Sequence, residues 1–172
     1  MKQALVAGIL IGFIFLQSCS KADDPVCTKE VSADVIAKVE KDKLAEDIVK
    51  IDAYLASKGI TALSEPNGVR YVINKQGTGV TIFCLENKIK VKYKGSLLVS
   101  GNQFDSNSTG VTFTLSGSII LGWKLVMPKI QTGSTVTLYI PSGFCYGAFV
   151  AADGKIPANS NLIFEIELLE IL

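Results

Sequence analysis

The chain of 172 residues contains no histidine, and that absence limits the chemistry available to it. Histidine is the usual general base near neutral pH, a member of most catalytic triads and a frequent zinc ligand. The chain also lacks a large net charge, because 17 basic and 16 acidic residues leave a formal net charge of +1. Such a chain has no electrostatic basis for binding nucleic acid or an anionic membrane face. The composition therefore argues against triad hydrolases, most zinc enzymes and nucleic-acid-binding proteins.

The sequence also lacks an apolar run at its start that is long enough to span a membrane. The apolar stretch at residues 5–16 is shorter than the roughly 20 residues that a transmembrane helix needs. It follows Lys2 and precedes a small residue, Ser18. A basic start, a short apolar stretch and a small residue before the break indicate a secretory signal rather than a membrane anchor. We expect residues 1–18 to be removed, which deletes Lys2 and leaves equal numbers of basic and acidic residues.

The end of this signal resembles a bacterial lipobox. Leu16, Gln17 and Ser18 precede Cys19, which the resemblance implies is acylated and becomes the first mature residue. Two or more acyl chains hold a protein stably on a membrane, each buried methylene contributing about 0.8 kcal/mol. Residues 19–31 then form a polar tether, whose acidic stretch is similar to export signals of Bacteroidetes surface lipoproteins. The expected location is the cell envelope, facing the periplasm or the cell surface, with the outer membrane as the preferred membrane.

Cysteines are few, and their spacing matches no metal site. Four occur in the chain, and with Cys19 acylated an odd number remains: Cys27, Cys84 and Cys145. Isolated thiols are the favoured interpretation. If an oxidising compartment allows a disulfide, the preferred pair is Cys84 with Cys145.

Residues 32–60 are predicted to form an N-terminal amphipathic helix. Ser32 is a suitable N-cap, and Gly59 is a suitable stop. The apolar residues repeat on one helical face: Leu44, Ile48, Ile51 and Leu55. We favour a face that docks on the following domain or holds that domain off the membrane. A dimerisation or partner-binding arm is the alternative.

Beyond Gly59 the apolar period changes from 3.6 to 2, which predicts strands. Five alternating sets occur, around residues 69–73, 89–93, 111–115, 136–140 and 164–168. One apolar face indicates an antiparallel sheet that wraps over an apolar element, with its other face in water. The cover is the short apolar segment at residues 118–127, which Pro128 stops. The predicted fold is therefore α+β, with a curved antiparallel sheet of about five strands wrapped on one short helix.

Seven ordered blocks resemble the FKBP family of peptidyl-prolyl cis-trans isomerases. They are VKYKG (91–95), GNQFDS (101–106), IILGW (119–123), LYIP (138–141), FCYGA (144–148), IPAN (156–159) and LIFEIELL (162–169). Any one block is weak, but the ordered set is specific. The likeness covers residues 69–172, and the preceding helix is similar to that of lipid-anchored FKBPs from Bacteroidetes. It implies an FKBP-like fold and isomerisation of X-Pro bonds in exported polypeptides, which assists folding.

The reaction implied by this resemblance suits a chain without histidine. An X-Pro peptide bond must rotate through a twisted state about 18–20 kcal/mol above the planar one. The planar amide has the larger dipole, so a dry apolar slot disfavours it relative to the twisted state. Aromatic walls and a few oriented donors are sufficient. The expected partners are proline-containing polypeptides, the membrane through the lipid anchor, and an FK506-like macrolide ligand, with no nucleic acid, no metal and no cofactor.

The resemblance also implies the site residues. Trp123 forms the floor under the proline ring, Asp105 orients the Tyr93 hydroxyl, and the Tyr146 hydroxyl and the Ile120 N–H bind substrate carbonyls. Phe164 belongs with Asp105, Trp123 and Tyr146 in the catalytic set. The substrate-binding walls are Tyr93, Phe104, Val111, Phe113, Ile119, Ile120 and Ile156. For the apolar members the plain alternative is that they are core residues, whereas Asp105 and Tyr146 are polar groups among aromatics and need a reason.

Two other functions stay open at this point. A polypeptide-binding chaperone could use the same groove with little isomerase activity, and an isomerase assay would separate the two. A glycan-binding or adaptor surface lipoprotein would need an exposed aromatic platform outside the slot. The single tryptophan, Trp123, lies inside the family pattern instead.

Overall fold

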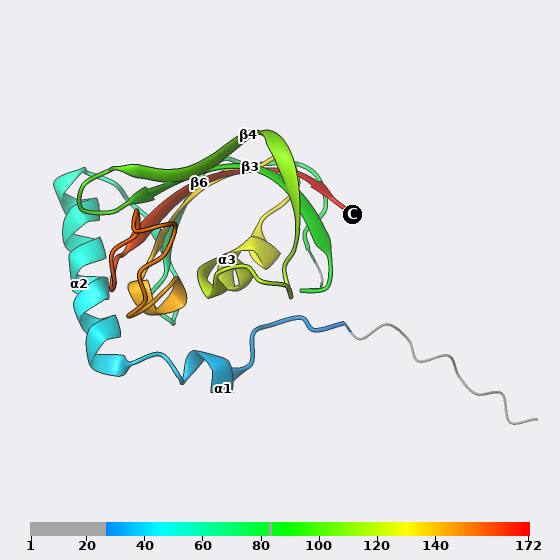
Figure 1. Ribbon diagram of the computed structural model, residues 1–172. Helices are drawn as coiled ribbons and strands as arrows, with labels where there is room; N and C mark the ends of the chain where they lie inside the picture. Colours follow the sequence, from blue (N-terminus) through cyan, green and yellow to red (C-terminus); the bar gives the residue numbers. More distant parts are fainter. Residues whose placement is uncertain (1–26, 83) are drawn as a thin grey trace, which may run out of the picture.

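The computed structural model describes residues 27–82 and 84–172 (Figure 1). The predicted signal and the acylation site at Cys19 lie outside these residues. Within the described ranges, no helix combines the length and the apolar character needed to cross a bilayer.

One antiparallel sheet of six strands organises the described chain, in the spatial order β1-β2-β5-β6-β3-β4. The five predicted strands are all present, and the α+β prediction is confirmed. A further strand of two residues was not predicted, because so short a segment has no alternation to detect. The strands are β1 (Leu63–Ser64), β2 (Arg70–Lys75), β3 (Lys88–Leu97), β4 (Gln103–Thr114), β5 (Thr135–Ile140) and β6 (Leu162–Ile171).

The predicted short helix lies in the concave face of this sheet (Figure 1). It is α3 (Leu121–Val126), and a 3₁₀ helix (Met127–Lys129) that contains Pro128 follows it directly. Gly122 allows α3 to approach β5 closely, since a Cβ at this position would fall on the Ile140 side chain of β5. The core consists of the inward residues of the sheet and the buried face of α3, including Trp123 at 2% exposure.

The predicted N-terminal helix is divided into α1 (Ala33–Ile36) and α2 (Lys41–Ser57). Ser32 precedes α1 but makes no side-chain cap. Glu40 is extended, and its carboxylate accepts hydrogen bonds from the N–H groups of Asp42 and Lys43, each at 3.0 Å. A new helix therefore begins at Lys41, because this cap satisfies two otherwise unpaired donors of the first turn.

The apolar face of α2 packs on the side of the sheet that the alternation predicted to be wet. Ile51 and Leu55 are buried there with Tyr139 of β5 and Ile163 of β6. In Figure 1, α2 stands across one end of the sheet. The helix face thus docks on the domain, as in the favoured interpretation, and it covers outward residues of β2, β5 and β6.

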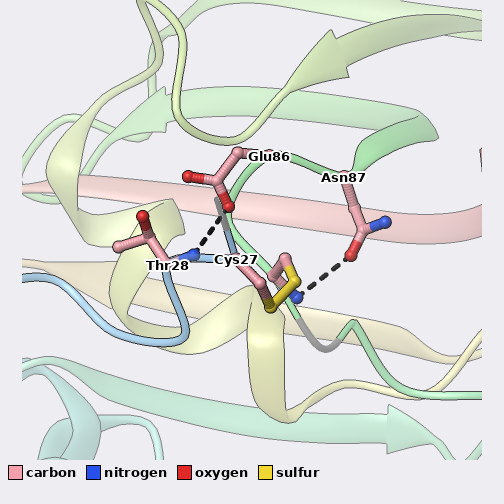
Figure 2. The surroundings of a disulfide bond; sticks show 5 residues. Cys27, Thr28, Glu86 and Asn87 are labelled. Atoms are coloured by element: carbon pink, nitrogen blue, oxygen red, sulfur yellow. Dashed lines mark hydrogen bonds between the residues drawn. A yellow bond between two sulfur atoms is a disulfide. The ribbon is translucent and has the colours of Figure 1, made fainter. Parts of the chain in front are cut away.

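The favoured interpretation of isolated thiols is wrong for Cys27 and Cys84, and the alternative pair of Cys84 with Cys145 is wrong as well. Cys84 pairs with Cys27, with their Cα atoms 5.1 Å apart (Figure 2). Cys145 is a free thiol. The physical reason is the path of the N-terminal segment, which was expected to be a tether but runs along the loop before β3. The Leu85 N–H donates to the Thr28 carbonyl at 2.7 Å, and the Thr28 N–H donates to the Glu86 carboxylate at 2.9 Å. The disulfide thus joins two segments that already lie side by side.

Candidate functional site

A cavity of about 350 Å³ opens beside α3, between β3, β4, β6 and the segment after β5. Aromatic rings from three strands and one helix converge on it. Its lining consists of Tyr93, Phe104, Asp105, Phe113, Ser118, Ile119, Ile120, Trp123, Cys145, Tyr146 and Phe164.

Trp123 is the centre of the ring cluster. Tyr93, Phe113 and Phe164 all meet its indole edge-on, with centroid distances of 5.7, 5.9 and 5.4 Å and interplanar angles of 80°, 84° and 88°. Edge-to-face pairs of this kind contribute roughly 0.5–1.5 kcal/mol each beyond their buried area. The indole is therefore held rigidly. Its buried Nε1 has no hydrogen-bond partner among the described residues.

Gly95 of β3 makes room for two of the rings. It lies opposite Asp105 on β4 and opposite Phe164 on β6. A Cβ at this position would lie 2.6 Å from the Phe104 ring and 2.9 Å from the Phe164 ring. A side chain here would displace the wall of the cavity, so the glycine is required by the close approach of the rings.

A pair of polar side chains lies at the mouth of the cavity. The Tyr93 hydroxyl donates to Asp105 Oδ2 at 2.6 Å, and the Ser106 N–H donates to Oδ1 at 2.8 Å. Both carboxylate oxygens are thus engaged, and the orientation of the Asp105 side chain is fixed. Burial, followed by the hydrogen bond to Asp105 and its negative charge, raises the pKa of Tyr93 to about 12. Tyr93 is therefore a neutral donor at physiological pH.

Two donors at the cavity are not used by the protein itself. Among the described residues, neither the Tyr146 hydroxyl nor the Ile120 N–H donates to another protein group. Ile120 is the residue before α3, where a backbone N–H has no partner within the helix. Burial raises the pKa of Tyr146, and the nearby Cys145 and Asp105 raise it further. Its hydroxyl therefore keeps its proton at neutral pH.

The structure brings together most of the residues predicted for the site. Val111 and Ile156 are the exceptions, since neither lines the cavity: Val111 is half-buried against the core, and Ile156 lies within the core. Val111 pairs with Val91 across the strands, beyond a register shift in β4. Ile156 is 1% exposed and belongs to the core.

Sequence reasoning missed two residues of the cavity lining, Ser118 and Cys145. Each is the chain neighbour of a residue that was predicted, Ile119 and Tyr146 respectively. This adjacency is the only signal that could have found them.

A larger groove of about 700 Å³ lies between the segment from Lys29 to Ile36 and the outer side of α3. It contains an ion pair between Glu65 and Lys129 and a scatter of aliphatic and proline side chains. It has no ring cluster, and none of the predicted site residues lines it. The aromatic cavity is therefore the candidate site despite its smaller volume.

Comparison with known proteins identifies the family to which the chain belongs. The sequence pattern of the family described as FKBP-type peptidyl-prolyl cis-trans isomerase matches residues 85–169. The outer membrane protein MIP of Legionella longbeachae is 31% identical over 164 residues, covering 85% of this chain and 68% of that protein. The crystal structure of a peptidyl-prolyl cis-trans isomerase from Pseudomonas syringae superposes with a TM-score of 0.65 at 29% identity, covering 76% of this chain and 94% of that one. The chain belongs to the family of FKBP-type peptidyl-prolyl cis-trans isomerases.

Some relatives are much longer than this chain. The isomerase FkpA of Buchnera aphidicola (subspecies Schizaphis graminum) is 38% identical over 136 residues, which cover 78% of this chain and 52% of FkpA. The chain spans about half the length of the FkpA proteins that it matches.

Proposed function

We propose that this protein catalyses cis-trans isomerisation of X-Pro peptide bonds in polypeptides, and that the cavity over Trp123 is its active site. One observation carries the proposal. Two unused donors, the Tyr146 hydroxyl and the Ile120 N–H, border a cavity whose floor and walls are rigid aromatic rings. This arrangement provides an apolar seat for a proline ring and hydrogen bonds for the carbonyls on either side of it.

The chemistry follows from the properties of the amide bond. Rotation removes the amide resonance, so the twisted state has a less polarised carbonyl and a more pyramidal nitrogen than the planar state. A cavity walled by Trp123, Phe113 and Phe164 solvates the planar dipole poorly, which favours the twisted state in relative terms. Each ~1.4 kcal/mol of that difference increases the rate tenfold.

The polar residues are assigned to positioning. Tyr146 and the Ile120 N–H hold the substrate carbonyls, so that the bound peptide turns about one bond only. Asp105, which the Tyr93 hydroxyl and the Ser106 N–H hold in place, faces the carbonyl that rotates. No proton is transferred, so the reaction requires neither a histidine nor a cofactor.

The substrates are proposed to be exported polypeptides. The support comes from the secretory pattern at residues 1–18, from the disulfide between Cys27 and Cys84, and from relatives that include an outer membrane protein. Disulfides persist in oxidising compartments such as the periplasm. Acylation of Cys19 would then hold the isomerase on the membrane close to its substrates.

The test is an isomerase assay on tetrapeptides with varied residues before proline, in the presence of a chelator. A folded protein that accelerates isomerisation, with loss of activity in Asp105→Leu and competition by an FK506-like macrolide, supports the proposal. A folded protein that leaves the uncatalysed rate unchanged for every peptide contradicts it. Suppression of aggregation of an unfolded client would then favour the chaperone alternative.

A further inference from the structure

A buried carboxylate connects α2 to the segment that carries Tyr146. Asp47 of α2 is completely buried, and its Oδ2 accepts hydrogen bonds from the Ser142 N–H at 3.0 Å and from the Ser142 hydroxyl at 2.5 Å. Its other oxygen pairs with the Lys43 ammonium. A buried carboxylate is costly unless such partners surround it. The position of Ser142 is therefore tied strongly to α2.

Ser142 in turn holds the backbone on both sides of Tyr146. Its carbonyl oxygen accepts from the N–H of Cys145 and from the N–H of Gly147, each at 2.9 Å. The Gly147 carbonyl then accepts from the Asn159 N–H at 2.7 Å. The backbone that presents the Tyr146 hydroxyl is thus fixed at its two neighbouring residues, because both of their N–H groups donate to the carbonyl of Ser142, the residue that Asp47 holds.

Two further contacts hold this segment in place, one from Asn161, just before β6, and one from Val39, just before α2. Asn161 Oδ1 also accepts from the Ser142 N–H, at 2.9 Å. Val39, just before α2, lies so close to Gly143 that a Cβ at Gly143 would clash with the Val39 side chain. We expect these contacts to keep the segment folded when Asp47 is changed. A change at Asp47 should therefore shift Tyr146 rather than unfold the segment that carries it.

We propose that Asp47 is a positioning residue for the isomerase reaction, acting through Ser142 on the Tyr146 hydroxyl. This inference rests on the proposed function. It makes α2 part of the catalytic unit, although α2 lies outside residues 85–169, where the family pattern matches. Asp47 touches no substrate itself, since it does not line the cavity.

The experiment compares kcat/KM of the full chain with those of Asp47→Ala, Asp47→Asn and Asp52→Ala. Asp52 is the matched control, because it also joins α2 to the sheet, through bonds of 2.9 and 3.1 Å to Arg70, but does not reach Ser142. We expect Asp47→Ala to lower kcat/KM roughly tenfold, because small displacements of a positioning group have large effects on rate. Asp47→Asn retains an oxygen acceptor for Ser142 and should recover most of the rate. Asp52→Ala should match the unchanged protein.

A double-mutant cycle separates positioning from a general structural effect. If Asp47 acts through the Tyr146 hydroxyl, Asp47→Ala should cost nothing further in a Tyr146→Phe background. The proposal is overturned if Asp47→Ala causes the same loss in both backgrounds or leaves kcat/KM unchanged. It is also overturned if Asp52→Ala causes an equal loss. If the protein without any substitution is inactive, the proposed function itself is refuted.

Each variant is assayed at a temperature at which circular dichroism shows it folded. If Asp47→Ala does not fold, Ser142→Ala replaces it, because that change removes only the hydroxyl bond to Asp47. A reduced kcat/KM that disappears in the Tyr146→Phe background is then the expected result. An unchanged kcat/KM in Ser142→Ala overturns the proposal.

Discussion

At the scale of single residues, the Tyr146 hydroxyl is the group whose removal should change the rate of catalysis without changing the stability of the fold. It donates to no other group among the described residues, so its removal leaves no protein acceptor unpaired. Tyr146→Phe should lower the rate of X-Pro isomerisation roughly ten- to hundredfold, as expected for the loss of about 1–3 kcal/mol of substrate hydrogen bonding. The melting temperature should not change. Tyr139→Phe, on the opposite face of the sheet, serves as the control and should alter neither quantity.

Tyr93 gives a prediction on pH. Burial and the bond to Asp105 raise its pKa to about 12, from an ordinary value of 10.0. The unfolded chain therefore releases this proton at lower pH than the folded protein does. Between pH 10 and pH 12 the folded state holds more protons, so the free energy of unfolding should fall as the pH rises through this window.

Denaturant unfolding at a series of pH values measures this effect. Lysines also titrate in the alkaline range, so the informative quantity is the difference between the unchanged protein and Tyr93→Phe. The variant should show a shallower decline above pH 10. Identical slopes would show that the Tyr93 hydroxyl is not held in its neutral form.

At the scale of elements, the sequence was informative wherever one face of an element is apolar and its length exceeds a few residues. Alternation at Val136, Leu138 and Ile140 predicted β5, because every second side chain enters the core. The break between α1 and α2 could not be predicted from periodicity. It depends on Glu40, whose backbone is extended and whose side chain caps α2, so that the chain does not form one long helix.

The same reasoning explains the outcome at the site. The aromatic members of the cavity could be predicted from the ordered family blocks. The absence of Val111 from the cavity lining could not be predicted in this way. It depends on a register shift in β4 near Asn107, whose side chain accepts from the Gly110 N–H at 2.7 Å. Asp47 also gave no signal, since a single acidic residue on a helix is normally solvated.

The disulfide gives a prediction about the N-terminal elements. It closes a loop with a sequence separation of 57 residues, which contains α1, α2, β1 and β2. In the chain-entropy account, such a cross-link stabilises the folded state by roughly 4 kcal/mol. Cys27→Ser combined with Cys84→Ser should lower the free energy of unfolding by an amount of this order.

Equilibrium unfolding in urea measures the change, and Cys145→Ser is the control because Cys145 forms no disulfide. The isomerase rate of the double variant should stay near that of the unchanged protein, since neither cysteine lines the cavity. A double variant as stable as the unchanged protein would show that the hydrogen bonds of Thr28 alone hold the segment.

At the scale of the whole molecule, the path of the N-terminal segment bears on where the proposed isomerase activity would act. The described chain begins at Cys27, which the disulfide fixes to the loop before β3. Only seven positions, 20–26, separate this fixed point from Cys19. An extended chain covers about 3.3–3.6 Å per residue, so this stretch spans at most roughly 25–30 Å. An anchor at Cys19 would therefore keep the domain within about one domain diameter of the membrane.

Acylation of Cys19 is the prediction on which this arrangement depends. Labelling of the expressed full chain with a fatty-acid analogue should give a labelled protein in the membrane fraction. Cys19→Ala should lose both the label and the membrane association, because the variant carries no acyl chain at this position to insert into the bilayer. Cys145→Ser is the matched control and should keep both. Undiminished labelling of Cys19→Ala would contradict the anchor. The proposed activity does not depend on this outcome, because the residues that line the cavity lie between positions 93 and 164.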